Sequence, residues 1–277
     1  MNIAQRTTSI VIPTFNRARL VPKAIESALS QTIKSEVILC DHGSTDDTPA
    51  VAARYGDRIR YIRRDVDRGP IACWRDGIEQ ASGELIHITY DDDWIDDDFV
   101  ARTQSALHDD VAFVYTRTQI HASDGTPTEV LLHHPAGRQP VSRIVQHLLR
   151  SELTISPGCA LFRKRDALKN LLTEVPGAAG IYGKNSGVGE DLLLFLLTTL
   201  DYAWYVHLPE PLAHFLAHPT SITTSAGSSG KMQALVSAYQ VAKQHYLRQP
   251  GSIPLATGLS AWIAKRRWKL AGRRPTA

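Results

Sequence analysis

Residues 9–16 read Ser-Ile-Val-Ile-Pro-Thr-Phe-Asn, a short β-branched run that ends in a proline and a polar turn. Apolar residues at helical spacing follow over residues 17–29, and a second strand-like run, Glu-Val-Ile-Leu-Cys, occupies residues 36–40. A strand, a helix and another strand in this order are typical of a crossover unit with parallel strands. This stretch therefore predicts an α/β fold.

The same alternation continues to about residue 100. Helix-start residues at 44–47 precede a short helix at 49–54, and a third strand is expected at 58–62. A helix at 71–81 and a fourth strand at 84–90 follow. Alternation of this kind predicts a Rossmann-like, mostly parallel sheet flanked by helices.

Past residue 105 the alternation loosens, and we expect a smaller mixed half with a glycine-rich loop at 178–189. Short strands are expected at 111–120, 129–133, 158–162 and 204–207, and helices at 143–149, 190–200 and 231–246.

The composition is that of an ordinary globular protein, with 43% hydrophobic and 21% charged residues, which excludes disordered, collagen-like and coiled-coil classes. The longest apolar run, residues 192–200, is far shorter than the ~20 residues of a membrane helix. No signal-peptide pattern is present. Cys40, Cys73 and Cys159 lie far apart, form no C-x-x-C knuckle and are expected to be buried thiols of a reducing compartment. We therefore expect a cytoplasmic protein.

The charge is unevenly distributed. Nine lysines and arginines and no acidic residue lie from Lys231 onward, so the rest of the chain is net acidic. Residues 262–270, Trp-Ile-Ala-Lys-Arg-Arg-Trp-Lys-Leu, predict a basic helix with tryptophans, which suits the surface of an anionic membrane. The alternative is a solvated helix packed on the domain. Nucleic-acid binding is not expected, because the body is acidic and carries no recognition motif.

Polar side chains follow three of the predicted strands where each strand ends. They are Pro-Thr-Phe-Asn at 13–16, Asp-His-Gly-Ser-Thr at 41–45 and three aspartates at 91–93. The carboxyl ends of parallel strands share one edge, where ligands bind, so these segments should converge. No G-x-G-x-x-G turn follows the first strand, which disfavours a dinucleotide-dependent oxidoreductase.

Each segment suggests a chemistry. The aspartates at 91–93 could hold Mg²⁺ or Mn²⁺, or could be a solvated turn. The second acidic run at 96–98 is interpreted as charge at a helix start. Asp41 could accept a hydrogen bond from the imide of uracil, or could cap a turn. Thr14 and Phe15 could line a base pocket, although Phe15 could equally belong to the core.

Together these segments resemble glycosyltransferase family 2, the inverting transferases of GT-A fold, over residues 7–100. The resemblance rests on the stretches at 9–17 and 37–48, on Arg-Gly-Pro and Gly-Ile-Glu-Gln-Ala-Ser-Gly-Glu within 68–84, and on Asp-Asp-Asp-Trp at 91–94. It implies a GT-A fold, a nucleotide-sugar donor that is usually a uridine diphosphate sugar, a divalent metal held by an Asp-x-Asp motif, and a carboxylate base.

The resemblance also implies residue roles. The base-binding loop would hold Pro13, Thr14, Phe15 and Asn16, with Asp41 as the base-reading carboxylate. Arg68 would contact the diphosphate, Asp91 and Asp92 the nucleotide, and Asp93 and Asp91 the metal (Mn²⁺ or Mg²⁺), with Asp93 the foremost ligand. The chain departs from the family pattern at Tyr90, His42 and Arg75.

The second half resembles the family more weakly. Glu190 and Asp191 precede an apolar helix, as in the family's Glu-Asp pair, which implies Asp191 as the general base and Glu190 as a residue that orients the acceptor. The alternative is a helix start with acidic residues in its first turn. His218, in a His-x-x-Ser segment, would reach the metal or the diphosphate.

These expectations combine into a metal-dependent inverting sugar transferase that acts on a glycan, lipid-linked or protein acceptor. The alternative is a non-catalytic nucleotide-sugar binder of the same family, which loss of Asp93 or Asp191 would favour. The expected organisation is a GT-A domain at 1–225, with a nucleotide-binding half (1–105) and a mixed acceptor-side half (106–225), and a basic helical extension at 226–277. That extension could hold the enzyme at the inner face of a membrane.

Overall fold

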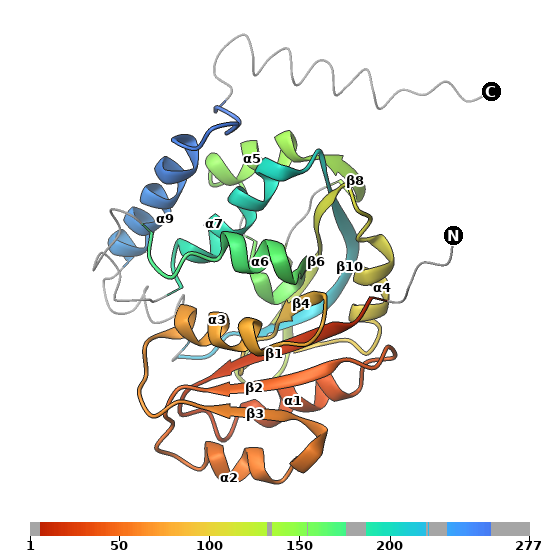
Figure 1. Ribbon diagram of the computed structural model, residues 1–277, viewed down its shortest axis with the longest axis vertical. Helices are drawn as coiled ribbons and strands as arrows, with labels where there is room; N and C mark the ends of the chain where they lie inside the picture. The colour runs from red at the N-terminus through yellow and green to blue at the C-terminus, as the bar shows by residue number, and fades with distance from the viewer. Residues whose placement is uncertain are drawn as a thin grey trace, which may run out of the picture.

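The computed structural model describes residues 6–131, 135–153, 155–175, 187–219, 221 and 232–255. Within these ranges ten strands form one sheet, whose main path runs β3-β2-β1-β4-β9-β6-β10-β5 (Figure 1). The first-half elements are β1 (Thr8–Thr14), α1 (Val21–Leu29), β2 (Glu36–Asp41), α2 (Thr48–Ala53), a 3₁₀ turn (Gly56–Arg58), β3 (Arg60–Arg63), α3 (Pro70–Gln80) and β4 (Leu85–Ile88).

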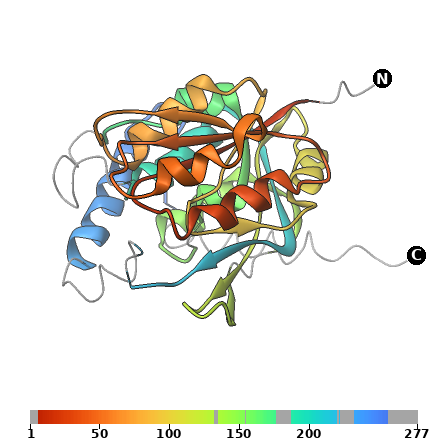
Figure 2. The same ribbon diagram turned by 90° about the horizontal axis from the view of Figure 1, so that it is seen from below.

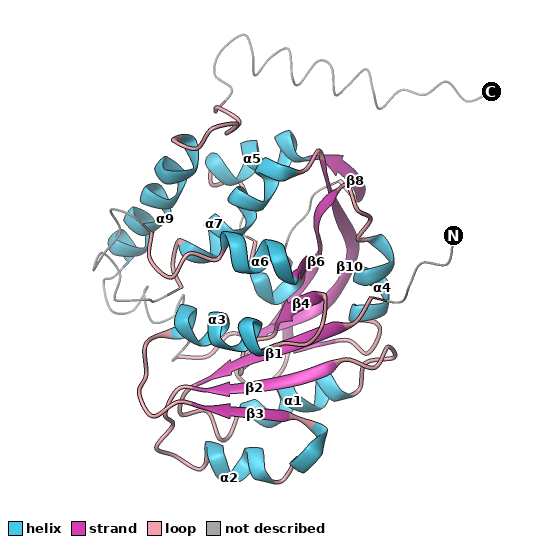
Figure 3. Cartoon of the chain, in the orientation of Figure 1, coloured by secondary structure: helices cyan, strands magenta, loops and turns pink. Residues whose placement is uncertain are grey.

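Strands β1 to β4 are mutually parallel, as the alternation predicts. All seven residues of β1 are buried, which requires cover on both faces of the sheet. Seen from below, α1 and α2 lie in front of these strands and α3 lies behind them (Figure 2). The arrowheads of β1, β2 and β3 point to the same side of the molecule (Figure 3), so the loops that leave these strands meet at one edge.

The second half is mixed. Its elements are β5 (Trp94–Ile95), α4 (Phe99–Ala106), β6 (Val111–His121), β7 (Pro127–Leu131), β8 (Gly137–Pro140), α5 (Val141–Leu149), a 3₁₀ turn (Pro157–Cys159), β9 (Ala160–Arg163), α6 (Lys164–Asn170), α7 (Glu190–Thr198), a 3₁₀ turn (Thr199–Asp201), β10 (Trp204–Leu216) and α9 (Met232–Leu247). Strand β9 runs antiparallel to both β4 and β6, and β10 runs parallel to β6. The parallel order is thus concentrated in the first half.

Strand β10 is much longer than the expected strand at 204–207 because it continues through two prolines. Its pairing with β6 is interrupted between Leu208 and Ala213, where Pro209 and Pro211 stand, and then resumes to Leu216. Prolines cannot donate to a ladder and usually mark a strand end, so the sequence conceals this continuation. The second segment of β10 carries the chain to the acidic triplet at 91–93.

Residues 96–98 lie at a helix start, as expected, but two of the three carboxylates also bind to other elements. Helix α4 begins at Phe99, and the Asp98 side chain makes no cap hydrogen bond. Asp96 instead lies 2.8 Å from His214 Nε2, and Asp97 accepts a hydrogen bond from the Ser30 hydroxyl at 2.6 Å. These carboxylates join the loop before α4 to β10 and to the end of α1.

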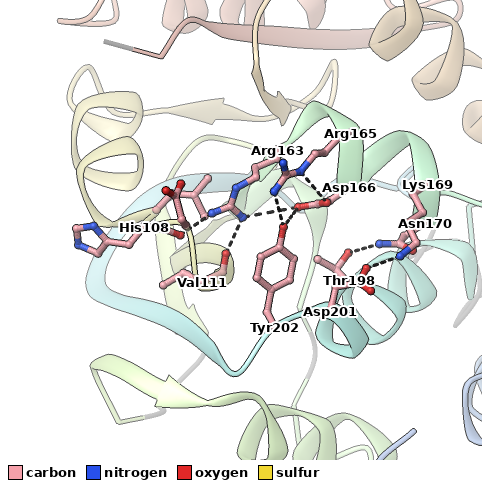
Figure 4. Close-up of polar contacts among 12 residues, drawn as sticks. His108, Val111, Arg163, Arg165, Asp166, Lys169, Asn170, Thr198, Asp201 and Tyr202 are labelled. Carbon is pink, nitrogen blue, oxygen red and sulfur yellow. Dashed lines mark hydrogen bonds and ion pairs between the residues drawn. The ribbon is translucent and has the colours of Figure 1, made fainter. Parts of the chain in front are cut away.

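A buried polar network joins β9 and α6 to the turn after α7 (Figure 4). Arg163 donates to the Val111 carbonyl at 2.7 Å and lies 3.6 Å from Asp166. Asp166 accepts a hydrogen bond from the Tyr202 hydroxyl at 2.7 Å, and Asn170 donates to the Thr198 hydroxyl at 3.1 Å. A buried charge of this kind is tolerated because it is paired and hydrogen-bonded, and the network fixes α7 relative to the sheet.

Helix α9 belongs to the same core as the sheet. Ala238, Ala242 and Tyr246 are buried, and α9 packs on α7. The basic residue Lys243 is itself buried and donates to the Ser151 hydroxyl at 2.5 Å. The expected basic helix at 262–270 lies outside the described residues. Over the described part of the chain, none of the helices combines the length and the apolar character needed to cross a bilayer.

Candidate functional site

The first two loops are held together by Asn16, which follows β1 with a positive φ of 55°. Its side-chain oxygen accepts hydrogen bonds from the backbone N–H groups of Thr45 (2.7 Å) and Asp46 (3.3 Å). Its own N–H donates to the Ser44 hydroxyl at 2.9 Å. Asparagine tolerates this left-handed conformation better than most residues. Asn16, which the resemblance assigns to the base-binding loop, therefore connects the loop after β1 to the loop after β2 through hydrogen bonds.

The acidic triplet lies against the first of these loops. Asp91 Oδ1 is 3.8 Å from Arg17 Nε. Burial, followed by the neighbouring carboxylate of Asp92, raises the pKa of Asp91 to about 7, and the Thr14 side chain and Arg17 offset part of this rise. The three strand ends that the sequence predicts to converge are thus adjacent in the structure.

The end of β10 approaches the same triplet from the other side. Asp93 is 6% exposed and accepts a hydrogen bond from the Leu216 N–H at 2.9 Å. His218 Nε2 lies 2.8 Å from Asp92 Oδ2. Burial and the charge of Asp92 raise the pKa of Asp93 well above its usual range. The predicted metal residues Asp91, Asp93 and His218 are therefore gathered in one place.

The residue types of this donor set suit a hard divalent cation, although their ligand atoms are not gathered as tightly as those of Cys40, His42 and Cys73, which lie within 4.8 Å of one another. Asp91 is partly buried and Asp93 is buried, and the charge of Asp92 raises the pKa of both, because like charges repel in a poorly solvated site. A divalent ion relieves that repulsion and prefers carboxylate oxygens, with imidazole an acceptable partner for Mn²⁺. The triplet thus fits a bound ion better than it fits a solvated acidic turn.

Asp191 occupies the first turn of α7. Its Oδ1 accepts hydrogen bonds from the N–H groups of Leu192 (2.7 Å) and Gly189 (2.9 Å), and its Oδ2 accepts one from the Tyr239 hydroxyl of α9 at 3.1 Å. Burial raises the pKa of Asp191 to about 6, and these hydrogen bonds oppose the rise. The carboxylate is thus oriented by three donors and has the proton affinity of a weak base.

Gly189, just before α7, is required by this arrangement. Its φ is +99°, and a Cβ added there would lie 3.1 Å from the Ala238 carbonyl oxygen. Both the conformation and the close approach of α9 favour glycine. This contact brings α9, and with it Tyr239, onto the start of α7.

Tyr90, which stands where many family members have an acid, lies near both acidic groups. Burial raises its pKa well above the usual range, and the charges of Asp191 and Asp93 both add to the rise. Its ring packs against Trp74 and Phe215, with centroids 5.5 and 6.2 Å away. Asp191 of α7 and Asp93 of the triplet therefore both raise the pKa of the Tyr90 hydroxyl, although they are almost one hundred residues apart in sequence.

Glu190 precedes Asp191 and is also buried. Its Oε2 has no hydrogen-bond partner within the described residues. Burial raises its pKa to about 7, with further contributions from Asp191 and Glu174. A buried polar atom left unpaired is costly, so Glu190 is available to bond a hydroxyl of a bound molecule.

Asp41 lies at the end of β2 with no exposed surface. Its two oxygens accept hydrogen bonds from the Ser44 N–H (2.8 Å) and the Tyr61 hydroxyl (2.6 Å). A base could reach this carboxylate only if the loop after β2 opened, so base reading by Asp41 stays a prediction. Phe15 is 42% exposed, which excludes the alternative that it belongs to the core, and Thr14 is buried.

Arg68 and Arg75 differ in what they contact. Arg68 Nη2 lies 2.7 Å from Asp76 Oδ2, so the arginine predicted to contact the diphosphate is engaged by α3. Arg75 donates to the carbonyls of Leu168 and Leu171 at the end of α6 and pairs with Glu79. Its departure from the family pattern therefore serves packing between α3 and α6. Pro13 lies within β1, paired with Cys40 of β2.

Sequence reasoning missed two residues of the site. Tyr239 belongs to a helix with no recognisable motif, and Trp74 is an apolar residue of α3. A tyrosine or tryptophan at helical spacing is usually a core residue, so the sequence held no signal that either lies near the carboxylates. Tyr90 was noted only as a departure from the family pattern.

The sequence is similar to those of known glycosyltransferases. Residues 9–172, more than half of the chain, match the sequence model described as glycosyl transferase family 2. A GalNAc(5)-diNAcBac-PP-undecaprenol beta-1,3-glucosyltransferase of Campylobacter jejuni is 40% identical over 90 residues, 31% of this chain and 29% of the relative. A putative teichuronic acid biosynthesis glycosyltransferase of Bacillus subtilis is 26% identical over 132 residues, covering 46% and 52% of the two chains. The chain thus spans between about a quarter and a half of these relatives.

Solved structures share the fold over most of the chain. TarS from S. aureus (residues 1–349) has a TM-score of 0.60 at 17% identity and covers 87% of this chain and 69% of its own. A complex of that protein with UDP-GlcNAc is similar, with a TM-score of 0.60. A mannosyltransferase from Pyrobaculum calidifontis in complex with GDP-Man and Mn²⁺ has a TM-score of 0.55 at 15% identity. The match covers 99% of this chain and 82% of the mannosyltransferase. These are GT-A folds, as the sequence resemblance implies.

Proposed function

Because the chain belongs to glycosyl transferase family 2, we propose that it is a metal-dependent inverting transferase that moves a sugar from a nucleotide-sugar donor to an acceptor hydroxyl. We propose a uridine diphosphate sugar as the donor, supported by the similar structure with UDP-GlcNAc. We propose a glycan or lipid-linked saccharide as the acceptor, supported by the undecaprenol-linked saccharide in the name of the Campylobacter relative.

One observation supports this proposal most directly: Asp93 and Asp191, far apart in sequence, both lie close enough to Tyr90 to raise its pKa. A transferase needs the leaving diphosphate and the acceptor hydroxyl on opposite sides of one anomeric carbon. The triplet at 91–93, next to the loops after β1 and β2, supplies the donor side. Asp191, at the start of α7, supplies the acceptor side.

The donor side would hold the cation through Asp93 and Asp91, with His218 beside them on Asp92. When bound, Mn²⁺ or Mg²⁺ there would neutralise charge on the leaving diphosphate. Asp93 is kept in place by the Leu216 N–H, and Arg17 lies close to Asp91. The protein thus orients its carboxylates from both β1 and β10.

On the acceptor side, Asp191 accepts the proton of the acceptor hydroxyl as that oxygen bonds to the anomeric carbon. The bond to the diphosphate breaks on the opposite face, so one displacement inverts the configuration. No protein nucleophile takes part. Tyr239 and the N–H groups of Gly189 and Leu192 hold Asp191, and Glu190 orients the acceptor through its unpaired oxygen.

The alternative, a non-catalytic nucleotide-sugar binder, has less support. A binder has no use for a carboxylate on the acceptor side whose pKa is raised to about 6 and which three donors orient. Both discriminating residues, Asp93 and Asp191, are present and lie near one site.

A screen of nucleotide sugars tests the function. Donor plus Mn²⁺ should raise the melting temperature, because a ligand that binds only the folded state stabilises it. The stabilising donor should then release free nucleotide diphosphate when an acceptor is added. A donor that stabilises the protein but releases no diphosphate with any glycan or lipid-linked acceptor would favour the non-catalytic alternative.

We expect Phe15→Ala to weaken binding of uridine diphosphate by about 10-fold, since stacking of a base on an aromatic ring is worth ~1–3 kcal/mol. The side chain is half exposed at the edge of the site, so its removal should leave stability unchanged. Calorimetry with uridine diphosphate and Mn²⁺ measures the effect. Leu247→Ala, which removes a similarly exposed apolar side chain at the far end of α9, is the matched control. Equal affinity of the two variants would contradict a stacking role.

We also propose a revised domain boundary. Because α9 packs on α7 and supplies Tyr239, the transferase domain extends past residue 225 to at least Leu247. The segment after it, including residues 262–270, is proposed to make the peripheral contact with an anionic membrane.

A further inference from the structure

Strand β2 and helix α3 bring together two of the three cysteines that are far apart in sequence. Cys40 lies in β2, and His42 follows two residues later, where the chain leaves the strand. Cys73 and Asp76 are three residues apart on α3, which places them on one face of that helix. Helix α3 packs on β2. The four side chains therefore meet between strand and helix.

The distances are those of a compact cluster. One ligand atom each from Cys40, His42 and Cys73 lies within 4.8 Å of the others. The Nε2 atom of His42 is 3.4 Å from Asp76 Oδ2, and Cys73 Sγ donates to the Cys40 carbonyl at 3.0 Å. Around a tetrahedral zinc ion, ligand atoms lie about 3.3–3.8 Å apart, given bonds of about 2.0–2.3 Å. An adjustment of about 1 Å would therefore close the cluster around an ion.

The histidine provides a second, independent observation. His42 is 1% exposed, its Nε2 lies 3.4 Å from Asp76 Oδ2, and neither ring nitrogen makes a hydrogen bond of normal geometry within the described residues. Buried polar atoms are normally paired, and one left unpaired costs about 1–3 kcal/mol. An imidazole nitrogen within 4.8 Å of two thiol sulfurs is the kind of ligand set that a soft metal ion binds.

We propose that Cys40, His42 and Cys73 form a site for a thiophilic divalent cation, zinc, with Asp76 as the fourth ligand. On binding, each thiol releases its proton to solvent and forms a metal–sulfur bond, and His42 and Asp76 each provide one further bond. The hydrogen bond from Cys73 to the Cys40 carbonyl is lost. Asp76 keeps Arg64 and Arg68 as partners for its carboxylate.

This site is separate in chemistry from the triplet at 91–93. Sulfur and imidazole ligands select zinc-like ions, whereas carboxylates suit Mg²⁺ and Mn²⁺. The cluster lies directly under the loop after β2, whose Ser44 accepts the hydrogen bond of the Asn16 N–H. A bound ion would fasten the end of β2 to α3 below the donor loops, so it would serve as a structural support of the site.

The full chain, purified under reducing conditions, provides the test. After dialysis against a weak chelator we expect the wild type to retain one zinc ion per chain. With Co²⁺ in place of zinc we expect a thiolate-to-metal charge-transfer absorption, which carboxylate ligands do not give. Cys40→Ala and Cys73→Ala should each weaken retention by more than about 100-fold and abolish the absorption.

Two variants serve as controls. Cys159→Ala removes the third buried thiol, outside the cluster, and should keep both the zinc and the absorption. Asp93→Asn should also keep both, which separates this site from the triplet. Circular dichroism verifies that each variant is folded. A wild type with neither retained zinc nor a charge-transfer band would overturn the proposal, as would a band that persists in both cluster variants.

Discussion

Asp191→Asn should lower the rate of sugar transfer by about 10²–10⁴-fold, the usual contribution of a positioned general base, and leave donor affinity unchanged. The amide oxygen can still accept the N–H groups of Gly189 and Leu192, so α7 should keep its start. Only the proton acceptor is lost. Turnover measured as release of diphosphate, together with calorimetry of uridine diphosphate and Mn²⁺, separates the two effects.

The pH dependence makes this test sharper. The base must be ionised to accept a proton, and burial raises the pKa of Asp191 to about 6. The rate of the wild type should therefore be level above that pH and fall as the pH drops through about 6. Tyr239→Phe removes a hydrogen bond that favours the ionised form. Its acid limb should move to higher pH.

Tyr246→Phe provides the matched control, because it removes a hydroxyl from the same helix where that hydroxyl accepts the Ile253 N–H instead. Its acid limb should coincide with that of the wild type. Near-normal turnover of Asp191→Asn, or an acid limb that Tyr239→Phe does not move, would exclude Asp191 as the base.

Asp93→Asn should abolish the increase in uridine diphosphate affinity that Mn²⁺ provides in the wild type, a loss of at least about 10–100-fold. Asparagine keeps an oxygen for the Leu216 N–H, so the local structure should persist. Without metal, the variant should melt at a higher temperature than the wild type, because a neutral amide replaces a group whose charged form is disfavoured by burial and by Asp92.

The control is Asp97→Ala, which removes an exposed carboxylate four residues further along. It should retain the full effect of Mn²⁺ on nucleotide affinity. If Asp93→Asn retained that effect as well, the assignment of Asp93 as a metal ligand would fail.

The first half of the fold can be predicted from the sequence because the secondary structure that each segment favours by itself is also the one that the parallel sheet requires. Strands β1, β2 and β4 are continuous apolar runs, and the helices between them are amphipathic, so the parallel order needs no distant information. The convergence of the loops after β1 and β2 with the triplet follows from that order alone. The family match over residues 9–172 confirms the resemblance.

The rest of the site could not be predicted because long-range contacts decide it. Asp41 appears from its position to face a ligand, but Tyr61 of β3 and the Ser44 N–H take both of its oxygens. The cysteines appear isolated, but the crossover from β2 to α3 places Cys40 beside Cys73. No local pattern encodes either contact, since each depends on how neighbouring elements turn their side chains.

The hydrogen bond from Tyr239 to Asp191 joins two segments that a reader of the sequence would treat as independent modules. The proton affinity of Asp191, the proposed base, is thereby set in part by a residue beyond 225, the expected end of the GT-A domain. A chimaera that kept everything up to residue 225 and received its last fifty residues from another transferase would inherit a different pH optimum along with the new tail. Engineering of acceptor choice in this chain should therefore exchange α7 and α9 together.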